Sequence, residues 1–192
     1  MKSKIFLILI LFSCLVFKLG YAKTQKILMI IAHKDFRDEE LFVPKKIFEK
    51  AGYKVVIASS TLKTCEGMLH HKVKPDKLIT QVKVKNYVAV VLVGGIGSVE
   101  YFNSPIVHRI VRRAYELHKV IGAICLAPCI LAKAGILKGK VATIWYSAAT
   151  CLEENGATFQ KKPVVVDGRI VTAAGPFAAR EFALEILRLL GK

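Results

Sequence analysis

Histidine is missing from the last third of this sequence. All five histidines of the 192 residues precede Cys125, and they are His33, His70, His71, His108 and His118. A cysteine nucleophile is usually activated by a general base, most often an imidazole within hydrogen-bond reach. Any catalytic scheme that needs a histidine downstream of Cys125 is therefore excluded.

Signatures of metals and cofactors are also lacking. Cys65 lies near His70 and His71, but this spacing matches no standard zinc pattern. Residues 94–97 are rich in glycine and follow an apolar run, yet they lack the full dinucleotide-binding fingerprint and the acid expected downstream. We therefore expect no metal and no classical cofactor.

Acidic residues are scarce, with 14 Asp and Glu against 30 Lys and Arg, which gives a formal net charge of +16. A basic surface attracts nucleic acid, anionic lipid or acidic polymers. The basic residues are scattered, however, and no nucleic-acid motif accompanies them. A solvated basic surface is therefore favoured over a specific nucleic-acid partner.

The sequence has no long apolar run that would comfortably cross a bilayer, which takes about 20 residues. Residues 5–17 form a shorter run, preceded by Lys2 and Lys4 and followed by Ala22 at a plausible cleavage point. This pattern predicts a signal peptide over residues 1–22 and an exported, periplasmic or extracellular domain over residues 23–192, with no integral membrane segment left. The alternative is an uncleaved N-terminal anchor.

Four cysteines remain after the predicted signal peptide: Cys65, Cys125, Cys129 and Cys151. An even number in an exported protein permits disulfides, but four cysteines in a domain of this size do not make a disulfide framework. Cys125 and Cys129 are four residues apart on one predicted helix face, where a bridge is awkward. At least one of them should remain a thiol, and whether Cys129 and Cys151 modulate Cys125 stays open.

Strand and helix patterns alternate from residue 27 onward. Apolar runs predict strands over residues 27–32, 54–60, 87–93, 120–124 and 140–145, and an Asp-Gly turn predicts a hairpin over residues 164–171. A polar turn is expected at residues 33–37, and short strands with a loop at residues 61–86. Helical spacing predicts helices over residues 38–51, 105–119, 126–134, 147–155 and 177–190. This alternation predicts an α/β fold with a mostly parallel sheet covered on both faces.

Three chain segments should meet at the carboxyl edge of that sheet, where sites form in such folds. They are the turn after Ala32, the glycines after Val93 and Cys125 after Ile124. A cysteine between a strand and a helix faces backbone N–H groups, which favour the thiolate and stabilise an oxyanion. The alternative is that Cys125 is only a small buried hydrophobe, and spacing alone does not decide between the two.

Several motifs occur together in one order along the chain. They are residues 36–41 with Pro44, Gly94 and Gly95 after Val93, residues 121–128 around Cys125, residues 137–141, residues 167–172, and Gly175 with Pro176. Over residues 25–190 this order resembles the ThiJ/PfpI family. The resemblance implies a three-layer, flavodoxin-like α/β sandwich with a cysteine nucleophile elbow, and a homo-oligomer.

The resemblance also assigns site residues. It makes Cys125 the reactive cysteine and Glu40 its partner carboxylate, with backbone N–H groups expected from Gly94, Gly95 and Leu126. A carboxyl beside a thiolate is pushed towards its protonated form, and the two groups titrate as a pair. The alternative for Glu40 is a solvated carboxylate in the first turn of a helix.

The sequence departs from the family pattern at the histidine. PfpI-type peptidases have a histidine directly after the cysteine, where this chain has Leu126, and the deglycase-like branch has one on the following strand, where residues 141–145 contain none. Class I glutamine amidotransferases share this fold and need a downstream histidine, so that activity is excluded. A peptidase mechanism is less favoured, and His33 is the one upstream candidate for a substitute.

Three functions follow as hypotheses. In the first, Cys125 attacks small reactive carbonyl, glycated or acyl substrates and Glu40 manages protons, as in the glyoxalase, deglycase or hydrolase activities that the family implies. In the second, the protein is a non-catalytic redox-sensing or chaperone-like stress protein, because an accessible thiolate is readily oxidised. The third is a basic binding module with a vestigial site.

Overall fold

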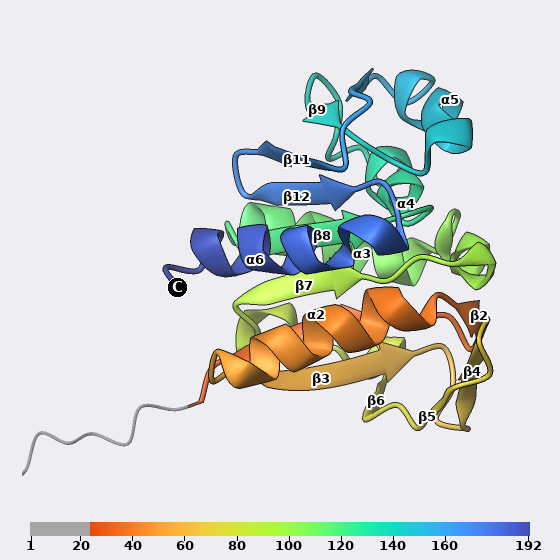
Figure 1. The fold of residues 1–192 in the computed structure, drawn as a ribbon, viewed down its shortest axis with the longest axis vertical. Coiled ribbons are helices and arrows are strands. Elements are labelled where there is room, and N and C mark those ends of the chain that lie inside the picture. The colour runs from red at the N-terminus through yellow and green to blue at the C-terminus, as the bar shows by residue number, and fades with distance from the viewer. Residues whose placement is uncertain (1–23) are drawn as a thin grey trace, which may run out of the picture.

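Seven strands form one sheet in the computed structural model, which describes residues 24–192 (Figure 1). Their order across the sheet is β11–β12–β8–β7–β1–β3–β6. The bounds are β1 Lys26–Ile30, β3 Lys54–Ser59, β6 Lys77–Leu78, β7 Ala89–Leu92, β8 Val120–Ile124, β11 Val164–Asp167 and β12 Ile170–Ala173. Neighbouring strands run parallel except β11, which forms the predicted antiparallel hairpin with β12.

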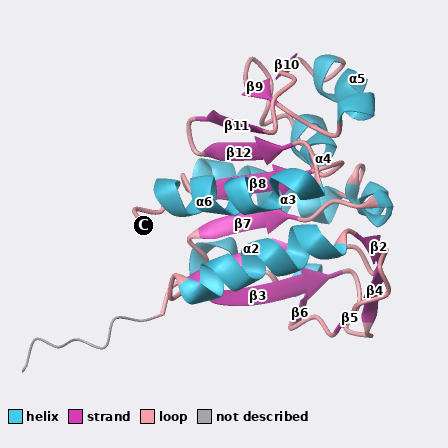
Figure 2. Cartoon of the chain, in the orientation of Figure 1, coloured by secondary structure: helices cyan, strands magenta, loops and turns pink. Residues whose placement is uncertain are grey.

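The central strands are apolar on both faces because helices cover both. Helices α2 (Asp38–Lys50) and α6 (Ala179–Leu189) lie on one face, and α3 (Pro105–Glu116) and α4 (Pro128–Lys133) lie on the other (Figures 1 and 2). The short helix α5 (Ala149–Glu153) packs beside α4. The predicted α/β sandwich with a mostly parallel sheet is therefore confirmed.

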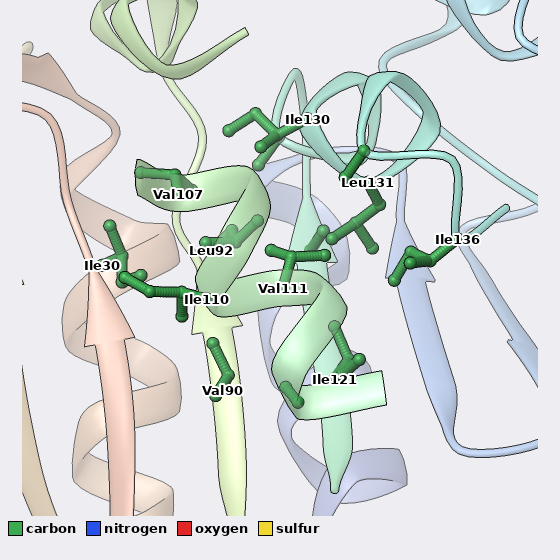
Figure 3. Close-up of a cluster of buried hydrophobic side chains, with 14 of the residues drawn as sticks. Ile30, Val90, Leu92, Val107, Ile110, Val111, Ile121, Ile130, Leu131 and Ile136 are labelled. Atoms are coloured by element: carbon green, nitrogen blue, oxygen red, sulfur yellow. The ribbon is translucent and has the colours of Figure 1, made fainter. Parts of the chain in front are cut away.

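Helix α3 shows how the sequence sets one of these layers. Ser104 caps its first turn by accepting a hydrogen bond from the Val107 N–H, and Pro105 occupies the first helical position. Val107, Ile110 and Val111 then lie on one stripe of the helix and face β7 and β8 (Figure 3). Each such buried aliphatic side chain contributes about 1.5–3 kcal/mol relative to full exposure.

The predicted strand over residues 140–145 is wrong in length and place. Only β9 (Val141–Ala142) is a strand, and it pairs with β10 (Thr158–Phe159) outside the main sheet. Side chains of the hairpin take the hydrogen bonds that a sheet neighbour would supply: Asp167 accepts from the Val141 N–H at 3.0 Å and Thr172 from the Thr143 N–H at 2.9 Å.

Two further predictions need correction near the sheet edge. The expected polar turn at residues 33–37 contains β2 (Lys34–Phe36), which pairs with β4 (Cys65–Gly67), and β4 pairs with β5 (Lys72–Val73). The helix expected from residue 126 begins at Pro128, because Cys125 has a left-handed backbone and residues 125–127 form a turn.

The predicted signal peptide at residues 1–22 lies outside the described residues, so it stays a prediction. Within residues 24–192, none of the helices combines the length and apolar character that crossing a membrane requires.

Candidate functional site

Cys125 lies at the carboxyl end of β8 in a left-handed backbone conformation, with φ of 62°. Such a φ is uncommon for a residue other than glycine, so surrounding contacts must hold it. The Cys125 N–H donates to the Ala173 carbonyl at 2.9 Å, and its carbonyl accepts from the Trp145 N–H at 2.9 Å. The elbow is thus fixed from both sides, and the side chain stays 8% exposed.

Glu40 projects from the first turn of α2 into the same place and is fully buried. Its Oε2 accepts a hydrogen bond from the Gly94 N–H at 3.0 Å. Within the described part of the chain, its Oε1 has no hydrogen-bond partner that meets the usual distance and angle limits. The neighbouring Cys125 thiol nevertheless interacts with the carboxyl and lowers its pKa. The alternative of a solvated Glu40 is therefore excluded.

The two side chains shift each other's titration. Burial raises the pKa of Glu40 to about 8, and its interactions with Cys125 and Gly94 offset only part of this rise. Burial, followed by the negative charge of ionised Glu40, raises the pKa of Cys125 to about 12, while the N–H groups of Gly95 and Leu126 lower it. Because Glu40 is mostly protonated at neutral pH, its repulsion of a thiolate is then largely absent.

Two glycines allow this close approach. A Cβ on Gly94 would lie 2.6 Å from the Cβ of Cys125 and 2.6 Å from Oε2 of Glu40, so a larger residue would displace both. Gly95 has a φ of 94°, which also favours glycine. The prediction for Gly94 needs correction, because its N–H is bound to Glu40. The N–H groups that face the sulfur belong to Gly95 and Leu126.

A pocket of about 270 Å³ opens above the Cys125 thiol. Its lining combines one cation with mostly apolar groups and consists of Arg37, Met68, Gly95, Ile96, Cys125, Leu126, Trp145 and Pro176. The pocket is large enough for a small organic molecule and presents the sulfur beside apolar walls. Trp145 lines the pocket, whereas Tyr146 packs near Phe159 and Phe177.

Sequence reasoning missed the residues that shape one wall. Asp38 is buried at 2% exposure and accepts hydrogen bonds from the Leu69 N–H at 2.8 Å, the His71 N–H at 3.2 Å and His71 Nδ1 at 2.9 Å. These bonds hold the loop that places Met68 in the pocket wall. In the sequence, Asp38 is only one of three acids at the start of a helix, and no pattern marks Met68 as a residue of the pocket.

The structure does not bring His33 into the pocket. Its Nδ1 contacts Oε2 of Glu100, and the other carboxylate oxygen of Glu100, Oε1, accepts from the Ser60 hydroxyl at 3.1 Å. His70 pairs with Glu66. No cluster of three or more His, Cys, Asp and Glu side chains suited to a metal ion occurs among residues 24–192.

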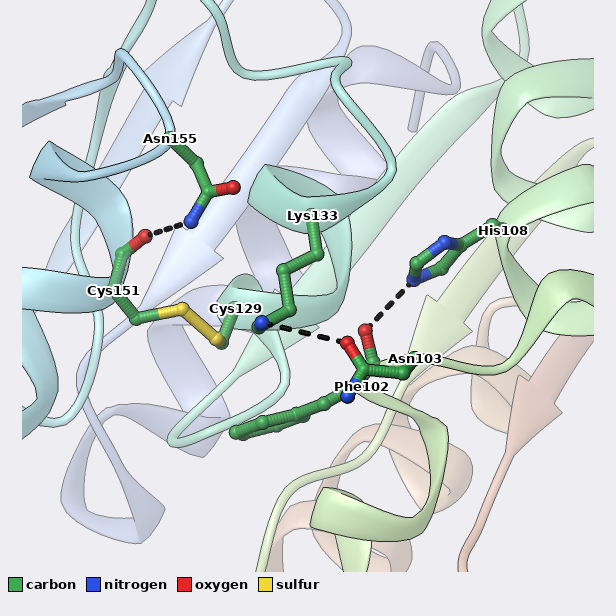
Figure 4. Close-up of a disulfide and its surroundings, with 7 residues drawn as sticks. All are labelled: Phe102, Asn103, His108, Cys129, Lys133, Cys151 and Asn155. Atoms are coloured by element: carbon green, nitrogen blue, oxygen red, sulfur yellow. Dashed lines mark hydrogen bonds between the residues drawn. A yellow bond between two sulfur atoms is a disulfide. The ribbon is translucent and has the colours of Figure 1, made fainter.

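A disulfide joins Cys129 of α4 to Cys151 of α5, with 5.7 Å between their Cα atoms (Figure 4). The Asn155 side chain donates to the Cys151 carbonyl at 2.8 Å beside the bridge. Cys65 and Cys125 are free thiols. The prediction that at least one of Cys125 and Cys129 remains a thiol is confirmed by Cys125. The Cys129–Cys151 pairing was not predicted.

Known proteins resemble this chain over nearly the whole described part. An uncharacterized protein of Methanocaldococcus jannaschii is 49% identical over 88% of this chain and 84% of its own length. A glutathione-independent glyoxalase of Caenorhabditis elegans is 27% identical over 88% of this chain and 90% of its own. Other relatives bear the names deglycase and putative cysteine protease.

Solved structures agree with these sequence relatives. A ThiJ/PfpI domain protein from Brachyspira murdochii superimposes with a TM-score of 0.86 at 32% identity, over 88% of this chain and 98% of its own. The match therefore spans nearly the whole of that protein. The model of the DJ-1/PfpI family matches residues 25–189. The chain therefore belongs to the DJ-1/PfpI family.

Proposed function

We propose that this protein is a cysteine-dependent enzyme that acts on small reactive carbonyl, glycated or acyl compounds, with Cys125 as nucleophile and Glu40 as its proton partner. The observation that carries the proposal is the pairing of the two groups. The Cys125 thiol at a strained elbow lies beside a fully buried carboxyl and opens into a pocket. Relatives named glyoxalase and deglycase support the same class of chemistry.

The chemistry begins with addition of the Cys125 sulfur to the electrophilic carbon. The S–H bond of Cys125 breaks as its proton passes to the carboxylate form of Glu40, a C–S bond forms, the carbonyl π electrons move to oxygen, and Glu40 returns the proton to that oxygen. Glu40 suits the proton transfer because its raised pKa of about 8 lies near neutral pH. The N–H groups of Gly95 and Leu126, which face the sulfur, would stabilise its negative charge before attack.

A second candidate is a redox function without turnover. The lining of the pocket contains no imidazole, so no histidine serves Cys125 as a base there. The sulfur can still be oxidised to a sulfenic or sulfinic acid, which the neighbouring N–H groups and Glu40 would hydrogen-bond. This candidate predicts oxidation of Cys125 and no turnover of carbonyl substrates.

We further propose export, with residues 1–22 as the signal. The Cys129–Cys151 disulfide supports this proposal, because such bonds are typical of oxidising compartments. Assembly into a homo-oligomer, which the family resemblance implies, stays a prediction.

Turnover of methylglyoxal by residues 23–192 tests the main proposal. We expect wild-type protein to convert the substrate, and both Cys125→Ala and Glu40→Gln to lose at least about a hundredfold in kcat/KM. Cys65→Ala and Glu49→Gln are matched controls, since Cys65 is the other free thiol and Glu49 lies on the same helix as Glu40, paired with Lys45 and outside the pocket lining. Both controls should keep wild-type activity.

Two outcomes would separate the candidates. Turnover that persists in Cys125→Ala would overturn the proposed mechanism. Absence of turnover in wild-type protein, together with peroxide-dependent oxidation of Cys125 detected by mass spectrometry, would favour the redox function.

A further inference from the structure

The sheet edge opposite Cys125 carries a group of cations, which we call the basic end: Lys26, Lys54, Lys85, Lys119 and Arg169. Each lies at the start of a central strand or within four residues before it. Lys26 and Lys54 begin the neighbouring strands β1 and β3 and are register partners. Figure 1 shows these strand starts on one side, with the chain entering β1 there. The basic end is therefore a continuous feature of the fold.

Carboxylates near the basic end already form ion pairs or hydrogen bonds with other groups. Glu49, Glu116 and Asp167 pair with Lys45, Arg113 and Lys140 respectively. Asp76, which acts on the nearby Tyr87, accepts a hydrogen bond from the Ile57 N–H at 2.8 Å. Among residues 24–192, no ion pair involves any of the five cations of the basic end. Their charge is thus available to an external anion.

The basic end also contains a pocket of about 300 Å³. Three lysines share its wall with uncharged polar groups, and the lining is Thr24, Gln25, Lys26, Lys85, Asn86, Tyr87, Val88 and Lys119. No carboxylate lines it. Three lysines in the lining suit a phosphate-type headgroup, which offers several acceptor oxygens to ammonium donors.

Charge is divided between the two ends of the sheet. The segments at the Cys125 edge carry six acidic side chains (Asp35, Asp38, Glu39, Glu40, Glu66 and Glu100) against five cations (Lys34, Arg37, Lys63, Lys72 and Lys74), so this edge is close to neutral while the basic end carries an excess of cations. A negatively charged surface would therefore attract the basic end and orient the molecule. In that orientation the pocket above Cys125 faces away from the surface and stays open.

We propose that the basic end binds an anionic bilayer surface, with a lipid phosphate in the pocket of Lys26, Lys85 and Lys119. The place where the chain enters the fold supports a membrane over other anions. Lys26 follows closely on an N-terminal sequence with an apolar run at residues 5–17 and no acid before Asp35. Either a retained anchor or a nascent exported chain would bring this end to the bilayer. The proposal is independent of the chemistry at Cys125.

Vesicle flotation with residues 23–192 tests the proposal, using phosphatidylcholine alone and phosphatidylcholine mixed with phosphatidylglycerol. We expect binding only to the anionic vesicles and a steep loss of binding with added salt. The variant Lys26→Gln, Lys54→Gln, Lys85→Gln, Lys119→Gln should bind about a thousandfold more weakly. It keeps the Cys125 end intact, so alkylation of Cys125 should match wild type and report a native fold.

The matched control removes the same charge from the other end through Lys34→Gln, Lys63→Gln, Lys72→Gln and Lys74→Gln, all at exposed positions. It should bind anionic vesicles as wild type does. If the two variants lost vesicle binding equally, net charge alone would explain the binding, and the proposal would be overturned. The assignment to lipid would be overturned if micromolar inositol hexakisphosphate abolished the binding to vesicles. It would also be overturned if the protein bound RNA more tightly than vesicles.

Discussion

At the scale of single residues, Cys125 and Glu40 hold protons as one unit. Removal of one proton leaves either a thiolate beside a neutral carboxyl or a thiol beside a carboxylate. These two forms have the same total charge, so their ratio does not change with pH. The second proton leaves only at much higher pH, because burial and the first negative charge both oppose it.

This coupling predicts an unusual pH profile for alkylation of Cys125 by iodoacetamide in a Cys65→Ala background. The wild-type rate should rise with pH and then level off near pH 8, where the pair has lost its first proton. In Glu40→Gln the thiol titrates alone, so its rate should keep rising about tenfold per pH unit through this range. Identical single-titration curves for the two proteins would show that the groups are not coupled.

At the scale of elements, the sequence was informative where burial alone decides the structure. Strands β1, β3, β7 and β8 are apolar on both faces, so their patterns predicted them and the edge at which Cys125 lies. The family resemblance selected Glu40, which a local pattern could not distinguish from its neighbours Asp38 and Glu39.

Other elements depend on partners that are distant in sequence. β9 ends at Ala142, and the next N–H, that of Thr143, is bound by the Thr172 side chain 29 residues away. The wall of the pocket depends on Asp38 holding the backbone of His71, 33 residues away. No local pattern encodes such side-chain-to-backbone bonds, which is why this wall and the place of His33 beside Glu100 could not be predicted.

The disulfide between α4 and α5 should be the main covalent support of the region that carries Trp145. It closes a loop with a sequence separation of 22 residues, for which the chain-entropy relation gives about 3 kcal/mol. We expect Cys129→Ala with Cys151→Ala to lower the free energy of unfolding by about this amount. Urea unfolding followed by the fluorescence of Trp145, the single tryptophan, measures it.

The matched control for the disulfide is wild-type protein under reducing conditions, which should lose the same stability as the double variant. Adding reductant to the double variant should have no further effect, since Cys65 and Cys125 are already thiols. A loss below about 1 kcal/mol would mean that packing of α5 on α4 suffices without the bond.

At the scale of the whole molecule, positive charge exceeds negative charge, with 30 Lys and Arg against 14 Asp and Glu. Residues 1–22 carry Lys2, Lys4 and Lys18 and no acid, so residues 23–192 have a formal charge of 16 − 3 = +13. Such an excess opposes the compact state through self-repulsion, and salt screens this repulsion. The repulsion is concentrated where Lys26 and Lys54 lie side by side without a carboxylate partner among the described residues.

Stability should therefore rise with ionic strength, and the gain should depend on which lysines are removed. Between about 0.05 and 0.5 M NaCl we expect the free energy of unfolding of residues 23–192 to increase by about 1 kcal/mol in urea, an uncharged denaturant. Removing the four lysines of the basic end should raise stability at low salt and shrink this gain. Removing the four at the opposite end should not, because Lys72 and Lys34 attract Glu66, whose pKa is lowered first by its hydrogen bond with His70 and then by these lysines. Equal behaviour of the two variants would show that total charge, not its division between the ends, governs stability.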